Sequence, residues 1–326
     1  MLLLNANDIK SVFTMDETID AVGKAFAMFS EGKIEVPLRT AIKGDNGSFL
    51  CMPAYCKELG VHCIKYCNSF SSNITRGLPT LPTQIMMSWA ENGIIFALID
   101  GIYLTKIRTG GSSGIAMKML AKKNCRKGAL IGTGGMASAQ LEAMICARKV
   151  EEVWIYDLSE KRLNAFIERE SDELAEYGVK FIVAKSSDEA VDGADMLITM
   201  TPSQKPVFDG NMLAPGCTVS CVGSYRPDMQ EMSPYVLTRA SKLYFDSKEA
   251  VLSESGDILK PLAEGLITEE LFAGDIGDVV LGKIGGREND DEIIVYETVG
   301  IAAQDLVTSK LVYDKAVAAG VGTEWN

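Results

Sequence analysis

One stretch of this chain predicts a strand, a glycine turn and a helix in direct succession: residues 127–137, Lys-Gly-Ala-Leu-Ile-Gly-Thr-Gly-Gly-Met-Ala. The apolar run 129–131 is typical of a buried parallel strand, and residues 137–149 carry apolar side chains at helical spacing. Gly132 permits the tight turn, Gly134 lets the backbone approach a pyrophosphate, and Ala137 allows close packing of the helix on the strand. The first N–H groups of the helix then offer hydrogen bonds to phosphate. The pattern predicts a dinucleotide site in a doubly wound α/β domain.

A second strand supports this interpretation. Residues 152–156 are strand-like and lead directly into Asp157, a little over ~20 residues past the first glycine. An acid at this place accepts a hydrogen bond from a ribose 2′-hydroxyl and repels a 2′-phosphate, so NAD is favoured over NADP. Ser159 and Lys161, just beyond it, leave room for NADP. The alternative is an ordinary βαβ turn that binds no ligand.

Bulk composition excludes several classes of partner. The chain has 326 residues, of which 47% are hydrophobic and 23% charged, so it is long enough for two domains of a soluble globular protein. Its net charge of −12 argues against nucleic acid or an anionic membrane as the main partner. The N-terminus does not resemble a signal peptide, and no apolar run approaches transmembrane length. We therefore expect a cytoplasmic protein.

Cysteine and histidine usage favours neither a metal site nor a nucleophilic triad. The eight cysteines lie mostly inside apolar runs and form no CxxC pair, which favours reduced, buried thiols. The single histidine, His62, lies in a strand-like run and alternates to the face opposite Lys65, so we interpret it as structural. We expect no bound metal.

The region before the glycine turn predicts a separate domain. Residues 8–31 predict a helix pair, in which Thr14 and Glu17 form a capping box. An antiparallel set of strands follows, which differs in kind from the α/β pattern after it. The expected strands are 37–42, 48–52, 61–66, 84–89 and 94–99, with a hairpin turn at 44–47.

Two cations in this region stand out. Lys65 lies in the middle of an apolar strand with Cys63 and Cys67 on its face, which is costly unless the lysine is paired or used. The alternative is an edge-strand lysine that discourages aggregation. Residues 100–120 are interpreted as a connector that enters a helix over 112–122, and Arg108 there could serve an anion or be a solvated surface charge.

After the first Rossmann half, strands recur as a doubly wound sheet requires. Thr201-Pro202-Ser203 follows one of them and residues 223–228 follow another, at the ends where such sheets bind ligands. A last strand, 293–296, leads into a closing helix over 301–319. The strands before it are expected at 179–184, 195–200, 217–222 and 242–245.

Markers of a known family run nearly from end to end of the chain. They are Met15-Asp16-Glu17, Met52-Pro53, Lys65-Tyr66-Cys67-Asn68-Ser69, Gly77-Leu78-Pro79-Thr80, Arg108-Thr109-Gly110, Gly132-Thr133-Gly134, Thr201-Pro202-Ser203 and Gly285-Gly286-Arg287-Glu288. Their order and spacing resemble the ornithine cyclodeaminase/mu-crystallin family, which also contains an archaeal-type alanine dehydrogenase and several imine reductases. The resemblance implies a substrate-binding and dimerisation domain over 1–118, to which the closing segment 305–326 returns, and a Rossmann NAD-binding domain over 119–304.

The resemblance also implies the site residues. Arg39, Lys65 and Arg108 would hold a substrate carboxylate, a role that suits the planar fork of arginine, and Thr80 is assigned to the substrate as well. A partly desolvated lysine can also exchange a proton, so Lys65 is a catalytic candidate together with Asp228. The residues expected to bind the cofactor are Arg108, Thr109, Gly132, Gly134, Gly135, Met136, Ala137, Asp157, Thr201, Pro202, Ser203, Gly223, Thr298 and Val299.

Several positions depart from the cyclodeaminase pattern. Leu50 stands where that pattern has a glutamate, and Tyr225 aligns with its catalytic aspartate. Asp228 follows three residues later, in a run that looks more like the ketimine and pyrroline-carboxylate reductase branch. Phe70 replaces a histidine of several relatives. Because ornithine cyclisation needs a carboxylate to deprotonate the side-chain amine, these departures favour a reductase.

The sequence thus predicts an NAD-dependent oxidoreductase, acting as a homodimer. It would transfer a hydride between nicotinamide and the Cα of a small α-amino or cyclic α-imino acid. One alternative is an ornithine cyclodeaminase, which converts ornithine to proline plus ammonia and recycles NAD. The other is a non-catalytic, crystallin-like binding protein, against which the retained lysine, arginines and glycine turn argue.

Overall fold

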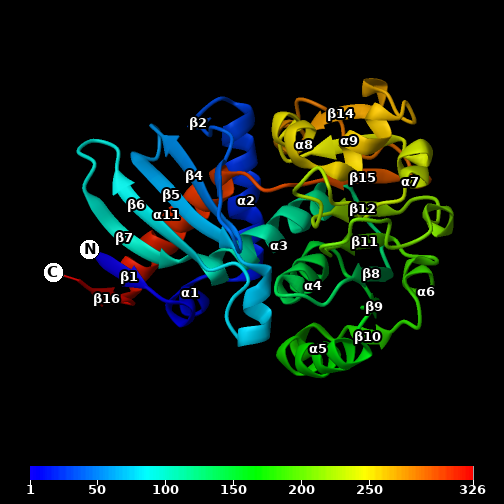
Figure 1. The fold of residues 1–326 in the computed structure, drawn as a ribbon, viewed down its shortest axis with the longest axis horizontal. Coiled ribbons are helices and arrows are strands. Elements are labelled where there is room, and N and C mark those ends of the chain that lie inside the picture. The colour runs from blue at the N-terminus through cyan, green and yellow to red at the C-terminus, as the bar shows by residue number, and fades with distance from the viewer. Residues whose placement is uncertain (326) are drawn as a thin grey trace. The chain divides into compact units, whose positions relative to one another are not determined.

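The computed structural model describes residues 1–325 and divides the chain into two compact units (Figure 1). Unit 1 comprises residues 1–108 and 301–325, and unit 2 comprises residues 109–300. The boundaries expected from the sequence were after 118 and after 304, whereas the structure divides inside helix α3 (Gly101–Leu120) and just before helix α11 (Ala302–Ala319). Each unit has its own sheet.

Unit 1 is built on a mixed sheet with the strand order β16-β1-β7-β6-β5-β4-β2, in which β3 also pairs with β4. The pairings from β4 to β7 are antiparallel, and β1 joins β7 in parallel. In the predicted hairpin between β3 and β4, the Gly44 N–H donates to the Gly47 carbonyl at 2.8 Å. The strands are β1 (Leu2–Leu4), β2 (Ile34–Glu35), β3 (Thr40–Lys43), β4 (Ser48–Cys56), β5 (Val61–Ser69), β6 (Thr83–Trp89), β7 (Ile95–Asp100) and β16 (Thr323–Glu324).

Helix α11 packs on β4, β5 and β6 and lies beside α2 (Figure 1). As predicted, α2 begins with a capping box between Thr14 and Glu17, each of which accepts from the backbone N–H of the other. Residues 302–309 of α11 are all buried, which is the pattern of a core helix rather than of an amphipathic surface helix. Helix α2 comprises Met15–Ser30, and unit 1 also contains α1 (Ala6–Val12), the 3-10 turn η1 (Ser71–Arg76) and the first part of α3.

Unit 2 has the predicted doubly wound sheet. The strand order is β10-β9-β8-β11-β12-β15-β13-β14, and each neighbouring pair is parallel. The order reverses at β8, and ligands of such sheets bind beside that point, at the carboxyl ends of the strands. The sequence did not predict β14. The strands are β8 (Lys127–Ile131), β9 (Glu152–Tyr156), β10 (Lys180–Val183), β11 (Met196–Thr199), β12 (Thr218–Cys221), β13 (Lys242–Phe245), β14 (Phe272–Asp275) and β15 (Ile294–Glu297).

The helices of unit 2 alternate with its strands. A buried apolar cluster beneath α4 and α5 includes Leu141, Met144, Val153, Phe166 and Ile198. The helices are α4 (Ala137–Ala147), α5 (Glu160–Glu173), α6 (Ser187–Val191), α7 (Pro234–Arg239), α8 (Lys248–Glu254), α9 (Gly256–Ala263) and α10 (Ile276–Val280), with 3-10 turns η2 (Ala175–Tyr177), η3 (Gly210–Met212) and η4 (Glu269–Leu271). Within residues 1–325, no helix has both the length and the apolar character needed to cross a membrane.

Helix α3 corrects one expectation. Residues 100–111 were expected to connect to a helix that starts at 112, but the helix begins at Gly101 and runs through the glycine pair 110–111. A side chain at Gly110 would place its Cβ 2.4 Å from the Ala139 carbonyl oxygen, so glycine is required there by the close approach of α4. Packing therefore overrides the poor helix propensity of the glycine pair.

Candidate functional site

Strand β5 directs Lys65 into the interior of unit 1. The residues of β5 alternate between buried and more exposed, and Cys63, Lys65 and Cys67 are buried on one face, as predicted. Lys65 lies opposite Met52 of β4 and Ile85 of β6, and its side chain is 1% exposed. It is therefore not an edge-strand lysine. His62 faces the other way and contacts the Ser88 hydroxyl at 3.3 Å, in line with a structural role.

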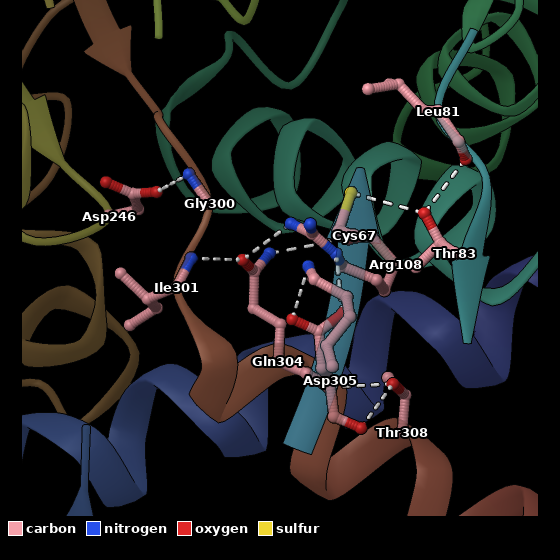
Figure 2. A network of polar contacts seen from close by, with 11 residues as sticks. Cys67, Leu81, Thr83, Arg108, Asp246, Gly300, Ile301, Gln304, Asp305 and Thr308 are labelled. Atoms are coloured by element: carbon pink, nitrogen blue, oxygen red, sulfur yellow. Dashed lines mark hydrogen bonds and ion pairs between the residues drawn. The ribbon is translucent and has the colours of Figure 1, made fainter. Parts of the chain in front are cut away.

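Helix α11 supplies Asp305, whose negative charge offsets the cost of burying the Lys65 ammonium. The Lys65 Nζ donates to Asp305 Oδ2 at 2.7 Å, and the Arg108 Nε donates to Asp305 Oδ1 at 3.1 Å. The carboxylate of Asp305 is fully buried and bridges two cations that lie far apart in the sequence. Figure 2 shows Asp305 and Arg108 side by side. Sequence reasoning missed Asp305.

Gln304, the residue before Asp305 in helix α11, holds the Arg108 side chain in place. Its Oε1 accepts from Arg108 Nη1 at 3.1 Å and from the Ile301 N–H at 3.0 Å, and its Nε2 donates to the Arg108 carbonyl at 3.4 Å (Figure 2). A guanidinium carries five N–H donors, and Asp305 and Gln304 use two of them. Arg108 is thus held rigidly and keeps donors for a ligand.

The cluster of Lys65, Arg108 and Asp305 has two cations and one anion. Burial of Lys65, together with the neighbouring Arg108, lowers the pKa of its ammonium to about 8, although Asp305 opposes the shift. A lysine with a pKa near neutrality can release and regain a proton during turnover. The surplus positive charge suits an anionic ligand.

Arg39 immediately precedes β3 in unit 1. The next residue, Thr40, pairs with Cys51 of β4, and the neighbour of Cys51, Met52, lies opposite Lys65 of β5. Arg39 is half-buried.

The loop before β6 holds the other predicted substrate residue. Thr80 is exposed there, and its carbonyl accepts from the Phe70 N–H at 2.8 Å. Closer to Lys65, the Thr83 hydroxyl donates to the Leu81 carbonyl at 2.9 Å and contacts Cys67 Sγ at 3.2 Å (Figure 2). These bonds fix the loop at the end of β5.

In unit 2 the glycine turn has the form that a pyrophosphate requires. Gly132 has φ +102°, and a Cβ there would lie 2.7 Å from the Met200 carbonyl oxygen. At Gly134 and Gly135 an added Cβ would meet nothing within 4 Å, so the backbone borders open space. Ala137 is fully buried at the start of α4, after Met136 as its N-cap. The turn fits a dinucleotide, since N–H groups of the first helical turn lack intrahelical partners.

Asp157 directly follows β9 (Glu152–Tyr156) and contacts this turn. Its Oδ2 accepts from the Thr133 N–H at 2.9 Å and from the Thr133 hydroxyl at 2.8 Å, and its Oδ1 accepts from Arg162 at 2.7 Å. Burial raises the pKa of Asp157, but the hydrogen bonds from Arg162, Ser159 and Thr133 outweigh it, so the net pKa is lowered. The acid is ionised at neutral pH.

The predicted loops after β11 and β12 are tied together by a residue that the sequence did not reveal. Glu231 accepts from the backbone N–H of Thr201 and, at 2.6 Å, from that of Gly223. Thr201 in turn accepts from the Ser203 N–H at 3.3 Å, across Pro202. Glu231 is fully buried, and it fixes both loops at the ligand-binding edge of the sheet.

The remaining predicted cofactor residues lie at other points of unit 2. The Thr109 carbonyl accepts from the Gln140 side chain at 3.0 Å. Asp246 accepts from the Thr298 hydroxyl at 2.6 Å and from the Val299 N–H at 3.1 Å. The next residue, Gly300, donates to the same Asp246 oxygen (Figure 2).

Asp228, the second predicted catalytic residue, is exposed in unit 2, whereas Lys65 belongs to unit 1. Its carboxylate pairs with Arg226 at 3.0 Å and accepts from Gln204 at 2.9 Å. Desolvation raises the pKa of Asp228, but the hydrogen bonds from Arg226 and Gln204 and the charge of Arg226 together outweigh it, so the net pKa is lowered. An acid of this kind is a poor proton donor at neutral pH.

Unit 2 also buries a cluster of acids. Asp257 and Glu297 are almost fully buried, and their carboxylates lie with Cys221 Sγ within 4.8 Å of one another. Burial raises the pKa of Glu231 to about 8, that of Asp257 to about 7, and that of Glu297 well above its usual range. Asp257 Oδ2 and Glu297 Oε2 have no hydrogen-bond donor among the described residues. These buried surroundings favour the protonated, neutral form of the carboxyl groups in the folded state.

Because these acids bind more protons when folded than when unfolded, stability should fall as the pH rises from about 4 to about 8. Glu297→Gln removes one of the titrating groups and keeps an acceptor for the Ser255 hydroxyl, which now bonds Glu297 at 2.7 Å. We expect a shallower fall of the melting temperature with pH in this variant than in the wild type, measured without cofactor. Glu264→Gln, at an exposed acid, is the control. A wild-type melting temperature that rises across this window would contradict the prediction.

Residues 1–320 match the ornithine cyclodeaminase/mu-crystallin family. The chain belongs to this family. It is 34% identical to a Δ1-pyrroline-2-carboxylate reductase of Bacillus cereus, over 99% of both chains. Its fold is similar to that of the Thermococcus litoralis Δ1-pyrroline-2-carboxylate reductase in complex with NADH and L-proline, with a TM-score of 0.95, 35% identity and 100% coverage of both chains. An archaeal alanine dehydrogenase dimer with bound NAD matches with a TM-score of 0.92 and 33% identity, over 100% of this chain and 99% of that one.

Membership of the ornithine cyclodeaminase/mu-crystallin family and the Rossmann fold class are thus confirmed. The relatives carry the names of reductases and dehydrogenases, in agreement with the predicted class of enzyme. The roles of the individual site residues stay predictions.

Proposed function

We propose that this chain is an NAD-dependent oxidoreductase that reduces a small cyclic α-imino acid, Δ1-pyrroline-2-carboxylate or a close analogue, to the amino acid. The observation that carries the proposal is the buried cluster in which Asp305 bridges Lys65 and Arg108. The reductases similar to this chain, at 34% and 35% identity, support the choice of an imino acid. The alanine dehydrogenase extends the range to α-amino acids in the oxidative direction.

Arg108 and Arg39 bind the substrate carboxylate through paired N–H donors. Lys65 donates a proton to the imine nitrogen, which makes the adjacent carbon a better hydride acceptor. When bound, reduced NAD supplies the hydride to that carbon. The C=N π bond is lost, one C–H and one N–H bond form, and Lys65 regains its proton from solvent. Asp305 keeps Lys65 in place and balances its charge between turnovers.

The cofactor is assigned to unit 2. The open backbone at Gly134 and Gly135, the buried Ala137 and the ionised Asp157 fit a dinucleotide with a free ribose 2′-hydroxyl. Glu231 holds the loops at Thr201 and Gly223 in the same edge of the sheet.

The pKa of Lys65 predicts the pH dependence of the reductive rate. Since only the protonated ammonium can donate, kcat for imine reduction should fall as the pH rises through about 8. The dissociation constant of NADH should not change over the same pH range, because Lys65 is not assigned to the cofactor. The measurement is a kcat profile from pH 6 to 10 at saturating substrate, and a flat profile would remove Lys65 as the proton donor.

The function itself is tested by mixing the purified protein with NADH and Δ1-pyrroline-2-carboxylate and following the absorbance of the reduced nicotinamide. Rapid loss of NADH supports the proposal. Release of ammonia from ornithine in the presence of NAD, without net NADH, would instead identify a cyclodeaminase. Tight binding of NADH without turnover of any imino or amino acid would favour a binding protein.

We also propose a homodimer, as in the alanine dehydrogenase relative. The outer face of the unit 1 sheet carries Tyr66 and Met86, which are 43% and 36% exposed and lie on adjacent strands. Light scattering should give twice the chain mass of 35.3 kDa.

A further inference from the structure

The chain crosses between the two units twice, and one buried side chain of unit 1 bonds to the residue at each crossing. Arg108 is the last residue of unit 1 before the first crossing, and Ile301 is its first residue after the second. The Oε1 of Gln304 accepts from Arg108 Nη1 at 3.1 Å and from the Ile301 N–H at 3.0 Å (Figure 2). Its Nε2 donates to the Arg108 carbonyl at 3.4 Å. One fully buried amide group therefore joins both crossings.

These three bonds determine which way the Gln304 amide points, because an amide has one accepting side and one donating side. Rotated by half a turn, its NH₂ group would face two donors, the Arg108 guanidinium and the Ile301 N–H. Its oxygen would then face the Arg108 carbonyl. Each mismatch would leave a buried polar group without a partner, which costs free energy. The amide therefore has one favoured orientation, and the position of Ile301 helps to fix it.

On the unit 2 side of the second crossing, Asp246 holds the backbone. Its Oδ2 accepts from the Val299 N–H at 3.1 Å and from the Gly300 N–H at 2.6 Å. The next N–H along the chain, that of Ile301, is the one that Gln304 accepts. Three consecutive N–H groups thus have fixed acceptors, two of them in unit 2 and one in unit 1. Val299 is one of the residues predicted to bind the cofactor, whereas Gln304 binds the arginine predicted to hold the substrate carboxylate.

We propose that Gln304 is a positioning residue that couples cofactor binding to substrate binding in this chain. With residues 298–299 engaged by a dinucleotide, the backbone holds the Ile301 N–H in place and the Gln304 amide keeps its orientation. Arg108 then keeps its remaining donors directed at the substrate carboxylate. A bound substrate stabilises the same arrangement from the other end, since coupling is reciprocal. The inference rests on the proposed function for the identity of the two ligands.

The test measures how L-proline, the expected product, changes the affinity for NADH. The dissociation constant for NADH is determined by nicotinamide fluorescence without L-proline and at saturating L-proline, and the ratio of the two constants is the coupling factor. In the wild type we expect L-proline to tighten NADH binding about fivefold or more. In Gln304→Met the coupling factor should fall to within about twofold of unity, while NADH alone binds as in the wild type.

Two further variants separate this role from a general defect. Gln304→Glu keeps an acceptor for both donors, so it should retain a larger coupling factor than Gln304→Met, although its added negative charge weakens L-proline binding. Ser309→Ala is the matched control in the same helix, because the Ser309 hydroxyl is buried and has no hydrogen-bond partner among the described residues. It should leave the coupling factor within about twofold of the wild-type value.

A measurement on the wild type keeps the proposal testable even if Gln304→Met does not fold. NADH alone, without L-proline, should slow amide hydrogen exchange in residues 301–305 of unit 1. Unchanged exchange there, a wild-type coupling factor of unity, or an unchanged factor in Gln304→Met would overturn the role of Gln304 while leaving the proposed function intact. Failure of the wild type to bind NADH would overturn both.

Discussion

Lys65→Met should lower kcat for imine reduction by about 10²- to 10⁴-fold, while the dissociation constant for NADH stays as in the wild type. Methionine keeps the apolar stem of the buried side chain but has no proton to donate. Asp305 keeps one cation, Arg108, at 3.1 Å, so the carboxylate does not lose its partners altogether. The measurement is steady-state reduction of Δ1-pyrroline-2-carboxylate together with NADH binding by fluorescence.

The matched control for this prediction is Lys24→Met. Lys24 is an exposed lysine of helix α2 in the same unit, so the same chemical change there should leave kcat unaltered. Full activity in Lys65→Met with normal NADH binding would show that the proton comes from another group. Loss of activity together with loss of NADH binding would point to a general structural defect instead.

Asp305→Ala should destabilise the protein by about 3–5 kcal/mol. The substitution leaves Lys65 and Arg108 buried against each other with no counter-charge, and their side chains are only 1% and 7% exposed. Adding Lys65→Met to Asp305→Ala should restore part of the lost free energy of unfolding, because it removes one of the two cations that have no counter-charge. The coupling between the two substitutions is read from a double-mutant cycle in urea.

Asp314→Ala is the control on the same helix. Asp314 pairs with Lys310 at 2.6 Å, but it is 51% exposed, so its loss should cost less than about 1 kcal/mol. If Asp305→Ala proved as mild as Asp314→Ala, the buried cluster would not hold α11 to the sheet. The free energy of unfolding is measured without cofactor, since bound ligand would mask the difference.

The features that sequence analysis predicted are those with a local signature. The glycine turn at Gly132 and the acid at Asp157 follow strands whose apolar runs are continuous. The face of Lys65 follows from the two-residue period of β5. The capping box at Thr14 is a three-residue pattern. In each case the physical cause lies within a few residues along the chain.

The features that sequence analysis missed depend on contacts between residues that lie far apart along the chain. Asp305 is 240 positions from Lys65, and in the sequence it is one acid in a helical segment. Its one signal is that, apart from Gln304, the other residues of 301–307 are apolar, which indicates a charge in a core helix. Glu231 carries no such signal, because it holds backbone N–H groups of loops that come together only in the folded sheet.

The most direct test of the central claim follows the hydrogen itself. The protein is mixed with NADH that carries deuterium at the transferable C4 position and with Δ1-pyrroline-2-carboxylate, and the product is examined by mass spectrometry and NMR. The account predicts proline with one deuterium at Cα for each NADH consumed. Proline without deuterium, or ammonia released from ornithine while the cofactor shows no net change, would contradict it.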